Sequence, residues 1–211
     1  MKYLKIIFLI LLSTVITNSQ SLFKLNYNVS FPNSTMKQYV DQTSYAGVNF
    51  EYGQYISNGN YSVGVSFGWD LFSEKYYGVT DINLPTEYGN LNGAISGNQI
   101  KNINVFPMLV NGTYYFKPNE HTIVPFVSFG TGFYFINQRY QAGVFELENK
   151  KWHFGISTEA GLIYKIQDRF GLNTSAKLNY AFDSGESISG KDDNSFSFWT
   201  INFGITYLYG Y

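Results

Sequence analysis

The chain has 211 residues, of which 19% are aromatic and only 14% are charged, and it contains no cysteine. This abundance of aromatic residues and scarcity of charge exclude a disordered chain. The 14 Lys and Arg residues are balanced by 15 Asp and Glu residues, which excludes a nucleic-acid binder that relies on an excess of cations. Without cysteine the chain can form no disulfide, thiolate zinc site or cysteine nucleophile.

The first residues have the pattern of a targeting segment. Lys2 and Lys5 precede an apolar run over residues 6–16, and small polar residues follow it. This order predicts a cleaved secretory signal peptide over residues 1–19. A transmembrane anchor is the alternative, but the run is shorter than the ~20 apolar residues that a bilayer requires. We therefore expect one mature domain over residues 20–211.

Beyond this segment, apolar and polar residues alternate, which is typical of strands with one apolar and one polar face. Phe23, Leu25 and Tyr27, for example, alternate with Lys24 and Asn26. Ordinary strands have five or six residues, whereas a tilted strand that crosses a bilayer needs ~9–11, and the predicted strands suit the second length. Eight strands are predicted, at about residues 23–31, 46–56, 61–71, 103–116, 123–135, 152–166, 170–182 and 199–209.

Short turns and long polar loops join these strands in alternation. The short turns lie at residues 57–60, 118–121 and 167–169, and the long loops lie at residues 32–42, 73–98, 137–151 and 183–195. Barrels of bacterial outer membranes have short periplasmic turns and long extracellular loops. We therefore predict an all-β fold, an eight-stranded antiparallel up-and-down transmembrane β-barrel of the bacterial cell outer membrane, with both termini on the periplasmic side.

The two faces of the predicted strands differ in side-chain size. One face offers Phe, Tyr, Trp or Leu at nearly every step, and the other offers mainly Gly, Ser, Asn and Thr. The interior of an eight-stranded barrel is only just wide enough for side chains, so we expect the large residues to face the membrane lipid. The alternative is a soluble barrel of the lipocalin or avidin type, with its apolar face turned inward around one ligand.

The last strand carries a spaced pattern of a polar residue, a glycine, a hydrophobic residue and an aromatic residue, at Asn202, Gly204, Tyr207 and Tyr209. With this pattern, the chain over about residues 22–211 resembles the small eight-stranded outer-membrane barrels, similar to OmpA, OmpX and OmpW. That family includes the PorT-like group known as the "outer membrane protein beta-barrel domain". The resemblance implies that these four residues form an assembly signal for the barrel-assembly machinery.

One further segment resembles the family, and one feature departs from it. Residues 125–132 alternate aromatic residues with Gly and Ser, as in a segment common in the family. Gly210 and Tyr211 follow Tyr209, whereas many family members end at the aromatic residue.

The polar face of the strands carries a few isolated charges. If residues 167–169 form a three-residue turn, Glu159 and Lys177 lie directly opposite each other on neighbouring strands. A single charge in a lumen of low dielectric constant is costly, so we expect these two to form a structural ion pair. A proton or ion path through the lumen is the alternative. The predicted structural lumen charges are Lys24, Glu51, Asp70, Glu159 and Lys177.

Catalytic residues are not apparent. The chain has two histidines, His121 in a predicted turn and His153 on the lumen face, with Ser157 and Glu159 below His153 on the same strand. Residues four apart on a strand are separated by roughly 13 Å, whereas a base must reach its nucleophile within about 3 Å. These residues therefore cannot form a triad, and we expect no enzymatic activity.

Metal and cofactor sites are not expected either. The loop over residues 183–195 could hold extracellular Ca²⁺ through its carboxylate oxygens, but the spacing matches no EF-hand or RTX repeat. We expect a solvated loop. Its acidic residues are Asp183, Glu186, Asp192 and Asp193.

The longest predicted loop, residues 73–98, is rich in aromatic residues. Long loops in compact domains are usually functional or disordered, so we expect a contact surface for a protein partner or a lid over the lumen. The loop over residues 183–195 is the second candidate contact surface. The aromatic and apolar residues of the first loop are Tyr76, Tyr77, Leu84, Pro85 and Tyr88.

These features predict a non-enzymatic barrel that acts as a structural or interaction protein through its extracellular loops, for example as an accessory subunit of a larger outer-membrane complex. The expected partners are membrane lipid, the barrel-assembly machinery and a protein at the loops. Two alternatives are a narrow channel for small or hydrophobic solutes, as the OmpW-like resemblance implies, and a lipid-modifying barrel enzyme.

Overall fold

The computed structural model describes residues 20–56, 60–86, 89–116, 122–143, 145–185 and 195–209. The predicted signal peptide over residues 1–19 lies outside these ranges, as do His121 and most of the two turns predicted at residues 57–60 and 118–121.

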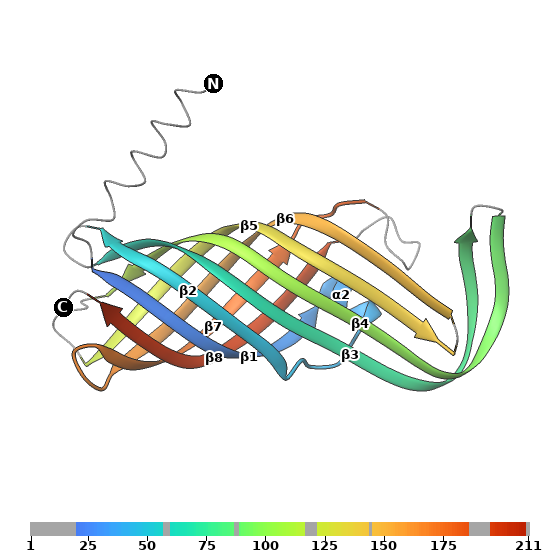
Figure 1. Ribbon diagram of the computed structural model, residues 1–211, viewed down its shortest axis with the longest axis horizontal. Helices are drawn as coiled ribbons and strands as arrows, with labels where there is room; N and C mark the ends of the chain where they lie inside the picture. Colours follow the sequence, from blue (N-terminus) through green and yellow to red (C-terminus); the bar gives the residue numbers. More distant parts are fainter. Residues whose placement is uncertain are drawn as a thin grey trace, which may run out of the picture.

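Eight antiparallel strands form a closed barrel in which each strand pairs with its neighbours in the sequence and β8 pairs with β1 (Figure 1). This confirms the predicted all-β, eight-stranded up-and-down fold. No helix among the described residues has the length and hydropathy of a membrane span. The elements are β1 (Ser21–Asn33), α2 (Ser34–Tyr39), β2 (Ala46–Ile56), β3 (Tyr61–Thr86), β4 (Gly89–Tyr115), β5 (Ile123–Ala142), β6 (Phe145–Lys165), β7 (Phe170–Ala181) and β8 (Phe196–Tyr209).

Around the middle of the barrel wall, the large apolar side chains point outward and the small polar ones point inward. Alternate residues of a strand face opposite sides of a sheet, and each strand has an outward apolar row, whereas inward residues near both ends of the barrel are apolar as well. This orientation agrees with the membrane-barrel prediction and disagrees with the soluble barrel. Outward residues that are about half exposed include Leu25, Phe50, Phe67, Val110, Phe129, Phe154, Leu172 and Phe203, one from each strand.

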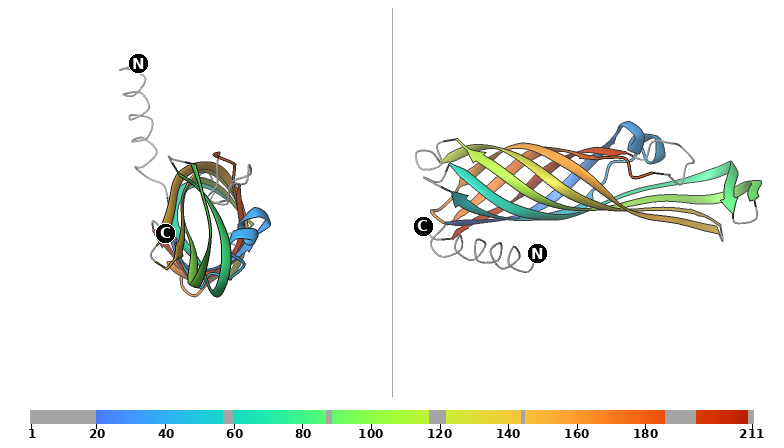
Figure 2. Two further views of the ribbon diagram at one scale, coloured as in Figure 1. Left: turned by 90° about the vertical axis from the view of Figure 1, so that its right-hand side faces the viewer. Right: turned by 90° about the horizontal axis from the view of Figure 1, so that it is seen from above.

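The barrel has two different ends. At one end, which we call the turn end, β1 begins and β8 ends, and β6 turns into β7 over Ile166–Arg169. At the other, the hairpin end, β3 and β4 continue far beyond the barrel wall, and β5 and β6 continue over a shorter distance (Figures 1 and 2).

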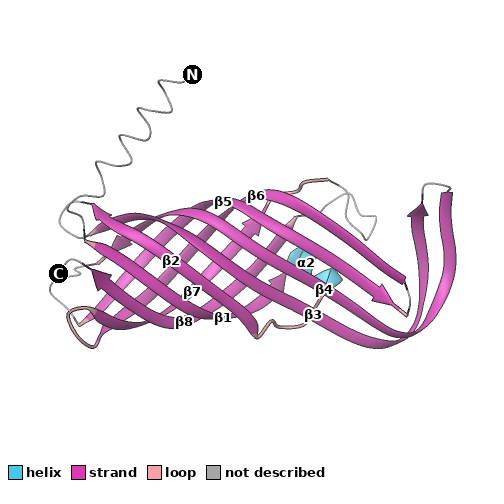
Figure 3. Cartoon of the chain, viewed as in Figure 1, coloured by secondary structure: helices cyan, strands magenta, loops and turns pink. Residues whose placement is uncertain are grey.

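Two of the predicted loops are therefore wrong. Residues 73–86 and 89–98 are strands: β3 and β4 remain in register from Ser73↔Asn102 out to Thr86↔Gly89. Residues 137–142 and 145–151 are likewise strands, paired from Asn137↔Lys150 to Ala142↔Phe145. Figure 3 shows both hairpins as continuous strands. The alternation of apolar and polar residues did not predict these strands. A sheet with water on both faces buries neither face, so polar and apolar residues need not alternate along it.

The predicted loop at residues 32–42 is shorter than expected. The strand β1 continues to Asn33, and the single helix of the described chain, α2, follows it. Ser34 has a positive φ of 49° at the start of this helix, and its backbone N–H donates a hydrogen bond to the Asn33 side chain. The helix packs against β8 and β1, so it lies over the rim of the barrel.

The barrel interior has three layers. An apolar cluster at the hairpin end contains Met36, Val40, Phe72, Ile103, Val105, Leu109, Tyr134, Ile136, Ala181, Phe196 and Phe198. A second apolar cluster at the turn end contains Leu22, Tyr115, Val124, Phe126, Ile163 and Leu208. A polar belt lies between them, and its members include Lys24, Asn26, Asn28, Asn49, Glu51, Asp70, Glu159, Ser175, Lys177, Thr200 and Asn202.

Candidate functional site

The cluster at the hairpin end closes the mouth of the barrel. Helix α2 supplies Met36, and the residue after the helix is Val40; both are essentially inaccessible to solvent. They pack with Phe72 of β3 and Phe198 of β8, whose rings meet edge to face at 5.5 Å. This plug was not predicted from the sequence, because α2 lies in a segment that was expected to be a loop.

The polar belt contains a salt bridge between Lys24 and Glu51. Lys24 Nζ lies 3.1 Å from Glu51 Oε1, and both side chains are almost fully buried. The ammonium group also lies 4.0 Å from the centroid of the Phe126 ring, which allows a cation–π interaction. Lys24 and Glu51 are direct register partners of β1 and β2, so the pair could have been predicted from the alignment of these two strands.

The other buried carboxylates are held by hydroxyl and amide groups. Asp70 Oδ1 accepts hydrogen bonds from Ser30 Oγ at 2.8 Å and from Asn28 Nδ2 at 3.4 Å. Glu159 Oε1 accepts hydrogen bonds from Ser175 Oγ at 2.5 Å and from Asn202 Nδ2 at 3.5 Å. Both carboxylates were predicted as lumen charges from the sequence, but these donors were not.

The turn between β6 and β7 sets the predicted register, but the predicted ion pair does not form. Glu159 and Lys177 are register partners, as the three-residue turn requires. Their charged groups nevertheless do not come within the 4.0 Å of a salt bridge, because Ser175 and Asn202 hold the Glu159 carboxylate.

His153 contacts Ser184, which follows β7, and not Ser157 of its own strand. Its Nδ1 donates a hydrogen bond to the Phe182 carbonyl oxygen at 2.9 Å, and its Nε2 lies 3.2 Å from Ser184 Oγ. The ring is fully buried and packs edge to face against Phe196. A serine hydroxyl lies within reach of a base here, but a neutral carbonyl rather than a carboxylate orients the imidazole. The contact ties the chain after β7 to the rim of the barrel.

The acidic loop falls mostly outside the described chain. Asp183 accepts a hydrogen bond from the Gly185 backbone N–H, whereas Glu186, Asp192 and Asp193 lie outside the described residues. Where the chain is described, no three His, Cys, Asp or Glu side chains gather as they would around a metal ion.

The extensions of β3, β4, β5 and β6 form a four-stranded sheet that protrudes from the hairpin end, and we call it the protruding sheet. The ladder between β2 and β3 ends at Leu71, although β3 continues to Thr86. The ladder between β6 and β7 begins at Gly155, although β6 starts at Phe145. Within the described ranges, no strand continues the sheet beyond β3 or β6 there.

One face of the protruding sheet carries a ladder of opposite charges. Arg139 pairs with Glu146 and Glu148 at 3.0 and 3.1 Å, and Lys150 pairs with Glu148 at 2.8 Å. Hydrogen bonds from Lys150, Asn137 and Arg139 hold the pKa of the Glu148 carboxyl at about 2, well below its usual range. Because these pairs are exposed to water, they orient the hairpin more than they stabilise it.

The opposite face of the protruding sheet holds aromatic residues above the mouth of the barrel. Lys101 Nζ lies 5.5 Å from the ring centroid of Tyr39 and 5.3 Å from that of Tyr76. Tyr140 donates a hydrogen bond to Gln99 Oε1 at 2.5 Å, and partial burial with the neighbouring Tyr76 raises the Tyr140 pKa to about 12. Tyr76, which was expected in a loop, thus lies on a paired strand.

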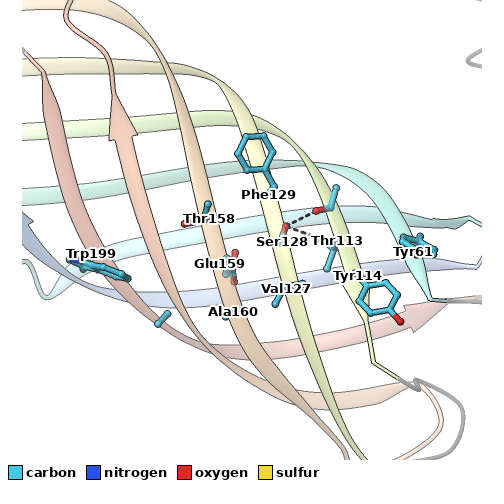
Figure 4. Close-up of a pocket in the computed structure, with 12 residues that line it drawn as sticks. Tyr61, Thr113, Tyr114, Val127, Ser128, Phe129, Thr158, Glu159, Ala160 and Trp199 are labelled. Atoms are coloured by element: carbon cyan, nitrogen blue, oxygen red, sulfur yellow. Dashed lines mark hydrogen bonds between the residues drawn. The ribbon is translucent and has the colours of Figure 1, made fainter.

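The outer wall of the barrel has a shallow apolar groove of about 720 Å³ (Figure 4). Its floor includes the small residues Gly112, Ala160 and Ala176, and aromatic side chains such as Phe129 and Trp199 border it. The groove results from small residues in a row of otherwise bulky outward side chains.

The four residues of the predicted assembly signal lie on both faces of β8. Asn202 is buried in the polar belt, and Gly204 faces the interior beside it, whereas Tyr207 and Tyr209 point outward. The predicted signal therefore combines two inward residues with two outward aromatic residues near the turn end.

Similar solved structures are small outer-membrane barrels. Neisserial surface protein A has a TM-score of 0.55 and 9% identity, with 90% of this chain and 97% of that chain covered. This chain has the fold of an outer-membrane β-barrel. Ail, the attachment invasion locus protein of Yersinia pestis, has a TM-score of 0.53 and 10% identity, with 92% and 100% covered. A major outer membrane protein from Thermus thermophilus has a TM-score of 0.52 and 10% identity, with the same coverage.

The sequence itself matches no family model, and no curated protein matches it. The likeness therefore lies in the barrel fold, at sequence identities of about a tenth.

Proposed function

We propose that this protein is an integral barrel of the bacterial outer membrane that binds another protein through its protruding sheet and catalyses no reaction. The signal peptide over residues 1–19 would export it, and the barrel-assembly machinery would recognise its last strand. The outward apolar rows support the membrane location, because a water-soluble protein rarely exposes apolar patches this extensive. The hairpin end would then face the cell exterior, as long extensions do in such barrels.

The protruding sheet carries the interaction proposal. Beyond Leu71, β3 runs along an open sheet edge. Backbone groups along such an edge can accept an added strand from a partner chain. Near the β3 edge, Tyr77 and Val79 are 80% and 70% exposed, so they offer apolar contact area where a partner strand would add.

A channel is less well supported by the interior. Apolar clusters fill the barrel at both ends, and the charges lie between them rather than along a continuous path. Conduction would require α2, with Met36, to leave the mouth and the cluster around Tyr115 and Phe126 to open as well.

The experiment compares the whole protein with a variant whose long hairpin is cut back. Gly78 and Gly97 are register partners, so the segment between them can be replaced by a short turn without touching the barrel wall. We expect wild type, but not this variant, to retain a stoichiometric partner after solubilisation of outer membranes in detergent. The matched control shortens the β5–β6 hairpin beyond Gln138 and Asn149, which are also register partners.

Heat-modifiable gel migration would show that each variant still folds into a barrel. Equal recovery of the partner with the full and the shortened β3–β4 hairpin would contradict the interaction proposal. Steady single-channel steps of the wild type in planar bilayers would instead favour the channel.

A further inference from the structure

The polar belt contains an unbalanced charge. Among the described residues, five charged side chains are buried in the barrel: Lys24, Lys177, Glu51, Asp70 and Glu159. Two are cations and three are carboxylates. Lys24 and Glu51 neutralise each other at 3.1 Å, which leaves Asp70 and Glu159 with Lys177 as the one remaining cation. The centre of the lumen therefore holds one more negative charge than positive charge.

The same belt contains buried oxygen atoms that accept no hydrogen bond. They are Asn26 Oδ1, Asn28 Oδ1, Asn202 Oδ1 and Glu51 Oε2, and each of the four residues is at least 97% buried. A buried polar atom without a partner costs about 1–3 kcal/mol, so four such acceptors in one belt require an explanation.

The amide orientations of two of these residues are fixed by their neighbours. Asn28 Nδ2 donates to Asp70 Oδ1, and Asn202 Nδ2 donates to Glu159 Oε1 and to Ser175 Oγ. Because a carboxylate only accepts hydrogen bonds, turning either amide over would place two oxygen atoms against each other. The hydrogen bonds of the two amide nitrogens therefore identify the unpartnered atoms of Asn28 and Asn202 as oxygens, which can only accept hydrogen bonds.

These residues lie together on the wall formed by β1 and β8. Asn28 and Asn202 are direct register partners, and Asn26 is the partner of Gly204, the next inward position. The Asn26 amide oxygen leans over Gly204, which lies two residues from Asn202 on the same face of β8. Asn28 donates a hydrogen bond to Asp70, and Asn202 donates one to Glu159. The two amides therefore link the wall formed by β1 and β8 to both carboxylates that lack a salt bridge.

We propose that the polar belt binds one alkali-metal cation through the side-chain oxygens of Asn26, Asn28 and Asn202, and that this cation offsets the surplus charge of Asp70 and Glu159. Hard cations prefer oxygen ligands of this kind. One monovalent cation balances the surplus charge and gives three of the four unpartnered acceptors a ligand at the same time. A water molecule would satisfy some of the acceptors but would leave the charge unbalanced.

The experiment measures the thermal unfolding of the refolded full-length barrel in detergent, in NaCl, KCl and choline chloride at equal ionic strength. A ligand that binds only the folded state raises its stability, so we expect unfolding temperatures at least roughly 3 °C higher in an alkali chloride than in choline chloride. Choline supplies the same ionic screening but is too large for the belt.

Two variants test whether the difference in unfolding temperature arises at the polar belt. Asp70→Asn keeps the shape of the side chain and removes the surplus charge, so the difference between alkali and choline salts should disappear. Glu148→Gln removes a carboxylate of the exposed hairpin ladder and should keep the full difference. Crystals grown in RbCl should show an anomalous peak beside Asn28 and Asn202. Equal unfolding temperatures of the wild type in all three salts, or a lumen without a rubidium peak, would overturn the proposal.

Discussion

The side-chain amide of Asn26 on β1 lies in the space that a Cβ atom on Gly204 of β8 would occupy. The two residues are register partners at the seam where the barrel closes. The Leu25 carbonyl oxygen crowds the same position, so a side chain at residue 204 would collide with backbone as well as with a buried amide. Gly204 is therefore needed for packing, whatever its role in recognition during assembly.

Replacing this glycine separates packing from recognition. We expect Gly204→Ala to lower the free energy of unfolding by about 1–3 kcal/mol, as overpacked interiors do. The measurement is equilibrium unfolding after refolding into detergent, where no assembly machinery is present. Gly112→Ala is the control, because the Cβ it adds meets no atom within 4 Å. Normal stability in detergent together with failed assembly in cells would assign Gly204 to recognition alone.

The ion pair between Lys24 and Glu51 offers a second test. We expect Lys24→Met to destabilise the barrel by about 3–5 kcal/mol, because it leaves the Glu51 carboxylate buried without its cation. The exposed pair of Lys150 and Glu148 is the control, since Lys150→Met should have a much smaller effect on stability. Chemical unfolding midpoints report both changes. Similar losses in the two variants would show that the lumen is hydrated enough to screen the buried pair.

The plug formed by Met36 can be tested with a matched methionine. We expect Met36→Ala to lower the free energy of unfolding by about 2–5 kcal/mol, because it leaves a cavity among Phe72, Ile103 and Phe198. Met108 points outward and is 37% exposed, so Met108→Ala in detergent should have a much smaller effect. If the Met36 variant kept the wild-type unfolding midpoint, α2 would contribute little to closing the barrel mouth.

The sequence predicted those parts of the molecule in which one face of a strand differs from the other. Strand number, barrel closure and the orientation of the apolar rows follow from alternation, and the register of Glu159 with Lys177 follows from the length of one turn. Part of the apolar cluster at the hairpin end was not predicted because β4 is apolar on both faces there: Val105 and Leu109 point inward, and Phe106 and Met108 point outward.

The hydrogen-bond partners within the lumen depend on contacts that no single strand reveals. The turn length placed Lys177 opposite Glu159, but Ser175 on the same strand and Asn202 on β8 hold the carboxylate instead. The protruding sheet was missed for a related reason. Its strands are joined by backbone pairing, and its polar side chains, such as Arg139, leave no apolar period in the sequence.

The charge ladder of the protruding sheet predicts an acid-dependent change outside the barrel. The pKa of Glu148 is lowered to about 2 by its hydrogen bonds with Lys150, Asn137 and Arg139. A carboxyl group with a lowered pKa supports the folded hairpin above its ordinary pKa of ~4.3, and this support is lost as the pH falls through about 2. We therefore expect the Glu148 carboxyl carbon to titrate near pH 2 in NMR spectra of the detergent-solubilised protein. Arg139→Gln should move the midpoint upward toward that of an ordinary glutamate. If Glu148 of the wild type titrated at the pH of an ordinary glutamate, the charge ladder would not persist in solution.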